Sequence, residues 1–140
     1  MLMTAADAPL ALAGGAPTIA DLVGLPMIGF RHCMSGERTD EFLRARGLDM
    51  RVVFRSDDNG TVQGLVGAGM ASALVPLLAA DPTDERVRVM AMDEEIPARR
   101  IAIAWHRDRA LSTAARAFID LTADLCAEIQ PTLDPVAARP

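Results

Sequence analysis

The chain has 140 residues, 51% of them hydrophobic and 24% charged, a composition that indicates one globular domain and excludes a disordered chain. The formal net charge is −5, all 14 basic residues are arginine, and the longest basic run is Arg99-Arg100, so direct nucleic-acid binding by this chain is not expected. Two cysteines without ligand spacing predict neither a disulfide framework nor a zinc site.

The hydrophobic segments are too short or too interrupted to be targeting or membrane segments. Asp7 breaks the apolar N-terminal stretch and no basic segment precedes it, so a secretory signal is not expected. The longest apolar run, residues 71–80, contains Pro76 and is too short to cross a bilayer. These observations predict a soluble cytoplasmic protein.

The first third of the chain contains one predicted strand and one predicted helix. Residues up to 26 are rich in Ala, Gly and Pro and predict only a helical turn at 18–23. The apolar run 27–30 is typical of a short buried strand. A loop at 31–36 follows it, and residues 37–46 are predicted to form a helix, with Ser35 as N-cap and Gly47 as the C-terminal stop.

The middle of the chain predicts strand, helix and strand in succession. Residues 51–55 are β-branched and bounded by turn residues, which favours a strand. A helix is predicted at 59–69 and a buried strand at 71–75, closed by Pro76. Because short loops join these elements, they predict a right-handed parallel βαβ unit.

The last part of the chain predicts two more strands and a long helix. Residues 77–85 are a predicted hinge or crossover, followed by strands at 87–92 and 100–106 around a turn at 93–97. Ile101, Ile103 and Trp105 alternate with smaller or polar residues in the second of these strands. The closing helix is predicted from Ser112, its N-cap, to Gln130, with Pro131 ending it. This alternation of strands and helices predicts an α/β class.

Six segments, in order and at matching spacing, resemble the effector-binding domain of LysR-type transcriptional regulators. They cover residues 7–125: DAPLA at 7–11, IADLVGLPMI at 19–28, FRSDD at 54–58 with VGAGMASALVP at 66–76, IAIAWHRD at 101–108, and STAARAFIDL at 112–121. The chain is therefore identified as a partial member of that family.

The resemblance implies an α/β, periplasmic-binding-protein-like (type 2) fold in which the chain crosses between two lobes and returns. It assigns residues 7–80 to lobe two, 81–130 to the hinge and the segment returning to lobe one, and 131–140 to a tail. The winged helix-turn-helix and the first half of lobe one are missing from the matched segments. Because the returning strands would then lack sheet neighbours, an exposed apolar surface is expected near 87–105.

The effector is expected at the carboxyl ends of the strands, where helix N-termini favour anions. In the family, the loop that matches 31–36 faces the cleft between the lobes. We therefore expect Arg31 to pair with the charge of the effector, Ser35 to donate a hydrogen bond to it, and Gly36 to lie against it. The alternative is that Ser35 only caps the helix and Arg31 is solvated. The acidic loop 56–58 would repel an anion, so its predicted role is helix capping.

Cys33 is a candidate redox residue. Its surroundings, RHCM at 31–34, resemble those of the reactive cysteine in peroxide-sensing members of the family, and a thiol near a helix N-terminus can have a lowered pKa. Position 42, where those sensors have a resolving cysteine, is Phe42 in this chain. The alternative is an unreactive loop cysteine. Cys126 is expected to be a small buried hydrophobic residue.

Enzymatic activity is not expected, because none of the common nucleophile, metalloprotease, phosphate-loop or dinucleotide motifs occurs. No catalytic residue, metal or cofactor is predicted. The expected partners are a small-molecule effector, for which a carboxylate is one candidate, and a second copy in a homodimer or a full-length regulator. Two functions remain open: the ligand-sensing part of a transcription regulator, or a truncated interaction module that senses nothing.

Overall fold

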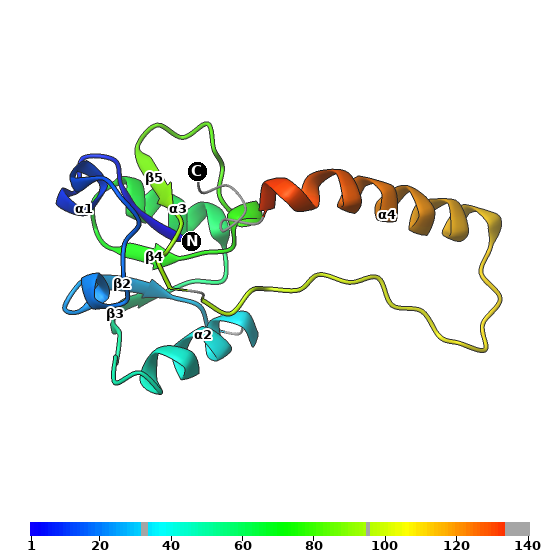
Figure 1. Ribbon diagram of the computed structural model, residues 1–140, viewed down its shortest axis with the longest axis horizontal. Coiled ribbons are helices and arrows are strands. Elements are labelled where there is room, and N and C mark those ends of the chain that lie inside the picture. The colour runs from blue at the N-terminus through cyan, green and yellow to red at the C-terminus, as the bar shows by residue number, and fades with distance from the viewer. Residues whose placement is uncertain (32–33, 95, 134–140) are drawn as a thin grey trace. The chain divides into compact units, whose positions relative to one another are not determined.

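The computed structural model describes residues 1–31, 34–94 and 96–133, which divide into a first unit, Met1–Arg99, and a second unit that begins at Arg100 (Figure 1). The first unit contains five strands: β1 (Leu2–Ala5), β2 (Pro26–Gly29), β3 (Arg51–Arg55), β4 (Ser72–Leu74) and β5 (Val87–Met90). Its helices are α1 (Pro9–Ala13), α2 (Met34–Arg44), α3 (Asn59–Gly67) and the short 3-10 helices η1 (Ala20–Leu22) and η2 (Leu77–Ala79). The second unit contains α4 (Thr113–Leu133). No helix in the described ranges is long and apolar enough to span a membrane.

The five strands form one mixed sheet in the order β3-β2-β4-β1-β5. β2 pairs parallel with both β3 and β4, which confirms the predicted parallel strands and places β2 between them. β1 pairs antiparallel with both β4 and β5. The strand predicted at 87–92 is therefore present, although shorter, and its partner is a strand that the sequence did not indicate.

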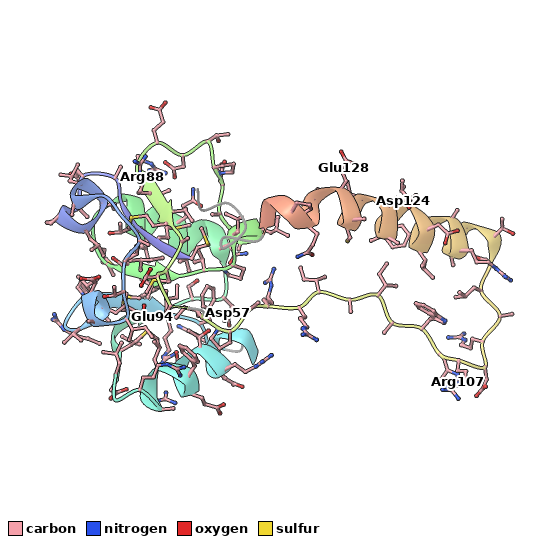
Figure 2. All side chains as sticks on the ribbon, viewed as in Figure 1. Asp57, Arg88, Glu94, Arg107, Asp124 and Glu128 are labelled. Carbon is pink, nitrogen blue, oxygen red and sulfur yellow. The ribbon has the colours of Figure 1, made fainter. Side chains whose placement is uncertain are left out.

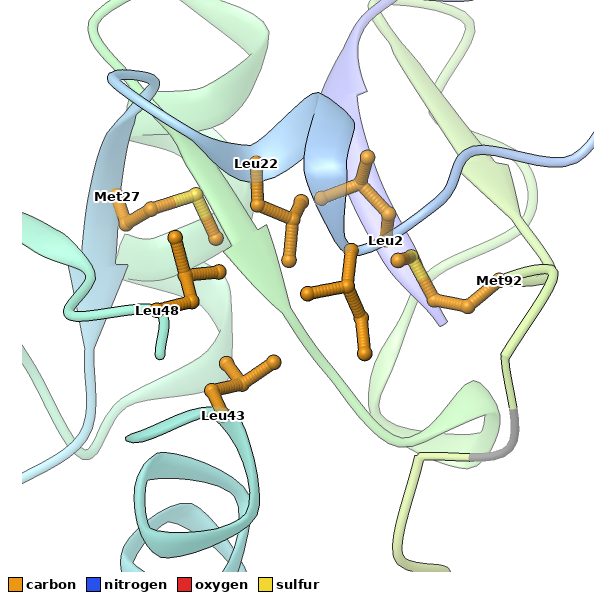
Figure 3. Packing of buried hydrophobic residues seen from close by; sticks show 7 residues of the cluster. Leu2, Leu22, Met27, Leu43, Leu48 and Met92 are labelled. Atoms are coloured by element: carbon orange, nitrogen blue, oxygen red, sulfur yellow. The ribbon is translucent and has the colours of Figure 1, made fainter. Parts of the chain in front are cut away.

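The central strands are buried on both faces of the sheet. Leu2 and Met27 pack in one hydrophobic cluster, whereas the next residues along the same strands, Met3 and Ile28, pack in another. Successive strand residues point to opposite faces, so the two clusters lie on opposite sides of the sheet. Figure 3 shows the first cluster, which is completed by Ile19, Leu22, Leu43, Leu48 and Met92. The second cluster includes Val62 and Val66 of α3.

α2 begins earlier than predicted and ends at Arg44, two residues before the predicted end, although Gly47 is the C-terminal stop as predicted. It starts at Met34, so Ser35 lies inside the helix and the prediction that Ser35 precedes it as N-cap is wrong. At the other end Gly47 has a φ of +81°, Leu48 donates its backbone N–H to Leu43 O (3.0 Å) and Gly47 donates to Arg44 O (2.9 Å). This pattern is a Schellman motif, and its apolar pair, Leu43 and Leu48, is buried in the first cluster.

Two elements near the N-terminus were not predicted. Residues 2–5 form β1, with all four residues buried, and 9–13 form α1, with Pro9 at its start. The predicted turn at 18–23 is confirmed as η1. The structure divides the chain after Arg99, and β5 belongs to the same sheet as β1.

The second unit differs from expectation in three ways. Residues 100–106 form no strand, so that prediction is wrong. Figure 1 shows this segment in yellow as an extended stretch of chain without secondary structure. α4 continues through Pro131 to Leu133, and Cys126 on this helix is exposed instead of buried. Proline interrupts only one backbone hydrogen bond near the end of a helix, so Pro131 does not end α4. The predicted cap is confirmed, since Ser112 Oγ accepts the backbone N–H of Ala115 (3.1 Å).

The predicted apolar exposure is confirmed for one part of its range. Ile101 and Trp105 are 71% and 55% exposed. Val87 and Val89 are instead half-buried against the second cluster, because β5 has a sheet partner in β1. The exposed surface therefore belongs to the second unit.

Candidate functional site

The candidate site lies at the carboxyl edge of the three parallel strands. β2 ends at Gly29 and leads through Phe30 and Arg31 toward α2, while β3 ends at Arg55 and leads through 56–58 to α3. Because β2 and β3 are parallel neighbours, these two loops emerge at the same edge of the sheet. The loop after β2, where the effector is expected, therefore lies next to the acidic loop 56–58.

Hydrogen bonds join the two loops closely. The backbone N–H of Arg31 donates to Asp57 Oδ1 (2.8 Å), and Arg31 Nε donates to Arg55 O (3.3 Å). In the other direction Arg55 Nη1 donates to Phe30 O (2.9 Å) and Ser56 N donates to Gly29 O (3.1 Å). The backbone at Arg31 is thus held by the loop after β3.

Gly29 lies close to the end of the Arg55 side chain. A Cβ atom at Gly29 would lie 2.8 Å from Arg55 Nη1 and 3.2 Å from Val52 Cγ1. The first distance is shorter than any normal contact, so a side chain at Gly29 would displace the Arg55 guanidinium from Phe30 O. The glycine therefore leaves room for the hydrogen bond by which Arg55 holds Phe30.

Arg31 is exposed, and its side chain is held only at Nε. In the described part of the chain, neither Nη1 nor Nη2 of Arg31 has a hydrogen-bond partner. These two nitrogens can donate to a carboxylate in the bidentate geometry that arginine favours. Ser35 and Gly36 lie in the first turn of α2, a few residues further on. The side chain of Ser35, and Cys33 altogether, lie outside what the structure describes.

The N-terminus of α3 already has a carboxylate of its own. Asp58 Oδ1 accepts the backbone N–H of Thr61 (2.6 Å), which confirms the predicted capping role of the acidic loop. Hydrogen bonds from the side chain and the backbone N–H of Thr61 hold the pKa of Asp58 below its ordinary value. An external anion would therefore be repelled at the N-terminus of α3.

The start of β1 and the end of β5 lie at this same edge of the sheet. Met1 exchanges backbone hydrogen bonds with Val75, just past the end of β4, and Leu2 is paired with Met90 at the end of β5. Beyond β5, Asp93 N donates to Pro17 O (2.7 Å), and Glu94 Oε2 accepts Ile19 N–H (2.8 Å). The segment after β5 is therefore held against the residues before β2.

A small cavity lies beside this edge, at the side of β3. Its volume is about 30 Å³, and its lining residues are Asp40, Arg44, Leu48, Asp49, Met50, Val52 and Arg55. Arg44 forms ion pairs there with Asp40 (3.5 Å) and Asp49 (3.9 Å). A space of this size holds about one water molecule, so it is too small for an organic effector. Among the predicted site residues whose side chains or backbone the structure describes here, neither Arg31 nor Gly36 lines it.

The roles of Asp57 and Arg55 in holding the loop after β2 were not predicted from the sequence. Asp57 was predicted to serve helix capping, but its carboxylate accepts the backbone N–H of Arg31. The sequence signal that could have indicated these roles is that both residues lie at the end of β3, the strand next to β2. For the described residues, no group of three or more side chains suited to a metal ion is present.

The fold and the site define an α/β effector-binding domain of the periplasmic-binding-protein type. The sequence model of the family described as the LysR substrate binding domain matches residues 1–127, and the chain belongs to this family. Domains of this family are parts of transcriptional regulators, which are not enzymes. No curated protein matches the sequence.

Solved structures of LysR-family regulators have the same fold. HinK from Pseudomonas aeruginosa is 23% identical, with a TM-score of 0.76 over 89% of this chain and 43% of that one. The C-terminal domain of a probable LysR regulator from Rhodococcus sp. RHA1 is 28% identical, with a TM-score of 0.72 over 88% of this chain and 62% of that one. The effector-binding domain of QuiR in complex with shikimate is 18% identical, with a TM-score of 0.74 over 91% of this chain and 60% of that one. The chain thus spans less than two thirds of the solved chains it resembles.

Proposed function

We propose that this chain is the ligand-sensing part of a LysR-type regulator and binds a small anionic effector at the carboxyl edge of its parallel strands. Arg31 pairs with the anionic group, and Ser35 and Gly36 of the first turn of α2 complete the contact. Residues 7–80 are assigned to lobe two, and 81–130 to the hinge and the segment that returns toward lobe one. The effector is held between the lobes and favours one arrangement of them, which shifts the regulator between its states.

The observation that supports the proposal most directly is the hydrogen bonding of Arg31. Asp57 and Arg55 fix its backbone and its Nε, while Nη1 and Nη2 are left for a ligand. A cationic group that is held in place before binding loses less conformational entropy when the ligand arrives. The QuiR domain binds shikimate, a carboxylate, and the same charge would suit Arg31.

Thermal stabilisation by a panel of carboxylates tests this function. Shikimate and benzoate are added to the chain at millimolar concentrations, and stabilisation by at least one of them is expected, because a ligand that binds only the folded state raises Tm. Arg31→Gln should abolish the shift. Arg51→Gln is the matched control, since Arg51 is an exposed arginine at the opposite end of β3. A shift that survives in Arg31→Gln would contradict the assignment of Arg31.

A second candidate is a truncated regulator that pairs with other copies or with full-length partners and senses nothing. It is favoured by the exposed apolar side chains of the second unit. The same carboxylate panel separates the two candidates, because a module without a sensing role shows no shift with any member. Homodimerisation is proposed for both.

A thiol-based redox role for Cys33 remains a further prediction of the sequence alone. A thiolate close to a helix N-terminus is oxidised by mild peroxide, and its sulfenic acid adds one oxygen to the mass. Mass spectrometry after peroxide treatment measures that addition, and Cys126, an exposed cysteine on α4, is the internal control. Equal modification of both cysteines, or an unmodified Cys33, would exclude a special reactivity.

A further inference from the structure

The edge strand β3 contains a bulge immediately before the candidate site. Met27 of β2 pairs with Val52, whereas the next residue of β2 pairs with Phe54. Val53 therefore has no partner on β2. One extra residue in a strand moves every later side chain to the other face of the sheet. The bulge thus changes the face on which Arg55, the last residue of β3, lies.

Because of this bulge, the side chains of Val52 and Arg55 reach the same face of the sheet. Residues three apart in a regular strand point to opposite faces. Here Val52 Cγ1 and Arg55 Nη1 both lie close to the place that a Cβ atom of Gly29 would occupy, at 3.2 Å and 2.8 Å from it. Since Gly29 has no Cβ atom, Arg55 Nη1 can donate a hydrogen bond to Phe30 O (2.9 Å). The bulge and the glycine together allow this one hydrogen bond.

Arg55 holds Arg31 in two ways. Its side chain binds the carbonyl of Phe30, the residue before Arg31, and its own carbonyl accepts a hydrogen bond from Arg31 Nε (3.3 Å). The backbone N–H of Arg31 donates to Asp57 (2.8 Å), which is labelled in Figure 2 and lies in the loop after β3. Among the ion pairs that the described residues form, none includes Arg31 or Arg55. The Arg55 side chain therefore bonds to the backbone of the loop instead of to a carboxylate.

We propose that Arg55 is a positioning residue for effector binding: it contacts Phe30 and Arg31, not the effector, and keeps the Arg31 guanidinium in the geometry that receives an anion. This inference rests on the proposed function, because Arg55 acts on the same site through Arg31. A loop that is fixed before the ligand arrives loses less conformational entropy on binding. Loss of the bond to Phe30 O should therefore weaken effector binding and leave the sheet folded, since Arg55 is exposed.

Two variants remove this hydrogen bond in different ways. Arg55→Met removes the donor together with its charge, whereas Gly29→Ala keeps the arginine and places a Cβ atom against Nη1. Isothermal titration calorimetry with benzoate and with shikimate is expected to give a Kd about tenfold higher for each variant than for the wild-type chain. The double variant should bind no more weakly than either single variant, because both changes break the same bond. Arg51→Met is the matched control, since Arg51 is an exposed arginine at the other end of β3.

Amide hydrogen exchange measures the positioning without any effector. In Arg55→Met and in Gly29→Ala, the Arg31 amide is expected to exchange about tenfold faster than in the wild-type chain, because the loop opens more often. The Ser56 amide is the internal reference, since it donates to Gly29 O (3.1 Å) where β3 leaves the sheet. Its exchange rate should stay as in the wild-type chain. Faster exchange of both amides would mean that Arg55 only stabilises the pairing of β2 with β3.

Other results would also overturn the inference. They are an unchanged Arg31 amide in Arg55→Met, an equal effect of Arg51→Met, and additive effects of the two variants on Kd. A higher Kd in Arg55→Met alone would mean that the charge of Arg55 matters and its hydrogen bond does not. A wild-type chain that binds neither carboxylate would instead contradict the proposed function, and the exchange rates would still decide whether Arg55 holds Arg31 in place.

Discussion

The two units of this chain reach regular structure by opposite routes. α3, in the first unit, contains three glycines in nine residues, which is a poor helix-forming sequence, yet Val62 and Val66 are fully buried. α4, in the second unit, has 21 residues, many of them good helix formers, and none is buried in the part whose side chains are described. α3 is therefore stabilised by tertiary packing, whereas α4 is stabilised by local helix propensity and its cap.

The largest expected difference between the two units is in the effect of truncating one leucine in each. Leu43→Ala removes a side chain that is fully buried in the first cluster, and a loss of about 2–5 kcal/mol in the free energy of unfolding is expected. Leu121→Ala, on the exposed face of α4, should change the unfolding of the sheet by less than about 0.5 kcal/mol. Urea unfolding of the two variants measures both. Equal losses would mean that the two units share one core.

The next largest effect is expected at Gln63, a buried polar residue of α3. Its Nε2 donates to Asp81 O (3.1 Å) and to Asp84 Oδ2 (3.2 Å), while its Oε1 accepts Asp81 N–H (2.9 Å). Gln63→Ala leaves these groups without their partner and should cost about 1–3 kcal/mol. Faster amide exchange at residues 81–86 should accompany the loss. Gln130→Ala, an exposed change on α4, is the control, and a similar loss there would remove the distinction between the units.

The two helix caps provide a smaller and more direct comparison. Asp58→Ala removes the carboxylate that accepts Thr61 N–H, and about 1 kcal/mol of stability should be lost from the main unfolding transition. Ser112→Ala removes the equivalent bond to Ala115 N–H in the second unit. It should lower the helix content in circular dichroism without moving the urea midpoint of the first unit. A midpoint shift in Ser112→Ala would show that α4 and the sheet unfold together.

The smallest effect is an acid dependence of the first unit. The pKa of Asp84 is held well below its ordinary value of 3.8, mainly because the Arg86 and Gln63 side chains donate hydrogen bonds to it. The pKa of Asp81 is lowered by hydrogen bonds from Thr83. A lowered folded-state pKa adds stability above the ordinary value, and this is lost as pH falls through the folded-state pKa.

The urea midpoint should therefore fall once the pH drops below about 4, and only modestly, because Asp81 and Arg86, the ion-pair partner of Asp84, are solvent-exposed. Asp84→Asn should flatten that dependence. An unchanged slope in Asp84→Asn would show that the pairing of Asp84 with Arg86 and Gln63 contributes nothing to the acid response.

The sequence predicted those elements whose signals are local. β3 lies where its β-branched run places it, α2 ends at the glycine that a Schellman motif needs, and Asp58 and Ser112 cap the helices that follow them. Of the candidate site, Arg31 was predicted by its position after β2, but its hydrogen bond to Asp57 was not. That bond joins residues 26 positions apart, and no local pattern encodes it.

The sequence by itself determined the family, the α/β class, the order of most elements and the two loops at the carboxyl edge. Only the tertiary structure decided that residues 2–5 are a strand, because Leu2 and Met3 lack β-branching and become a strand through their pairing with β4 and β5. It also decided that residues 100–106 are not a strand, although Ile101, Ile103 and Trp105 alternate well. Alternation makes a segment suitable for a sheet, but a strand forms only where a neighbour supplies hydrogen bonds and covers the apolar face.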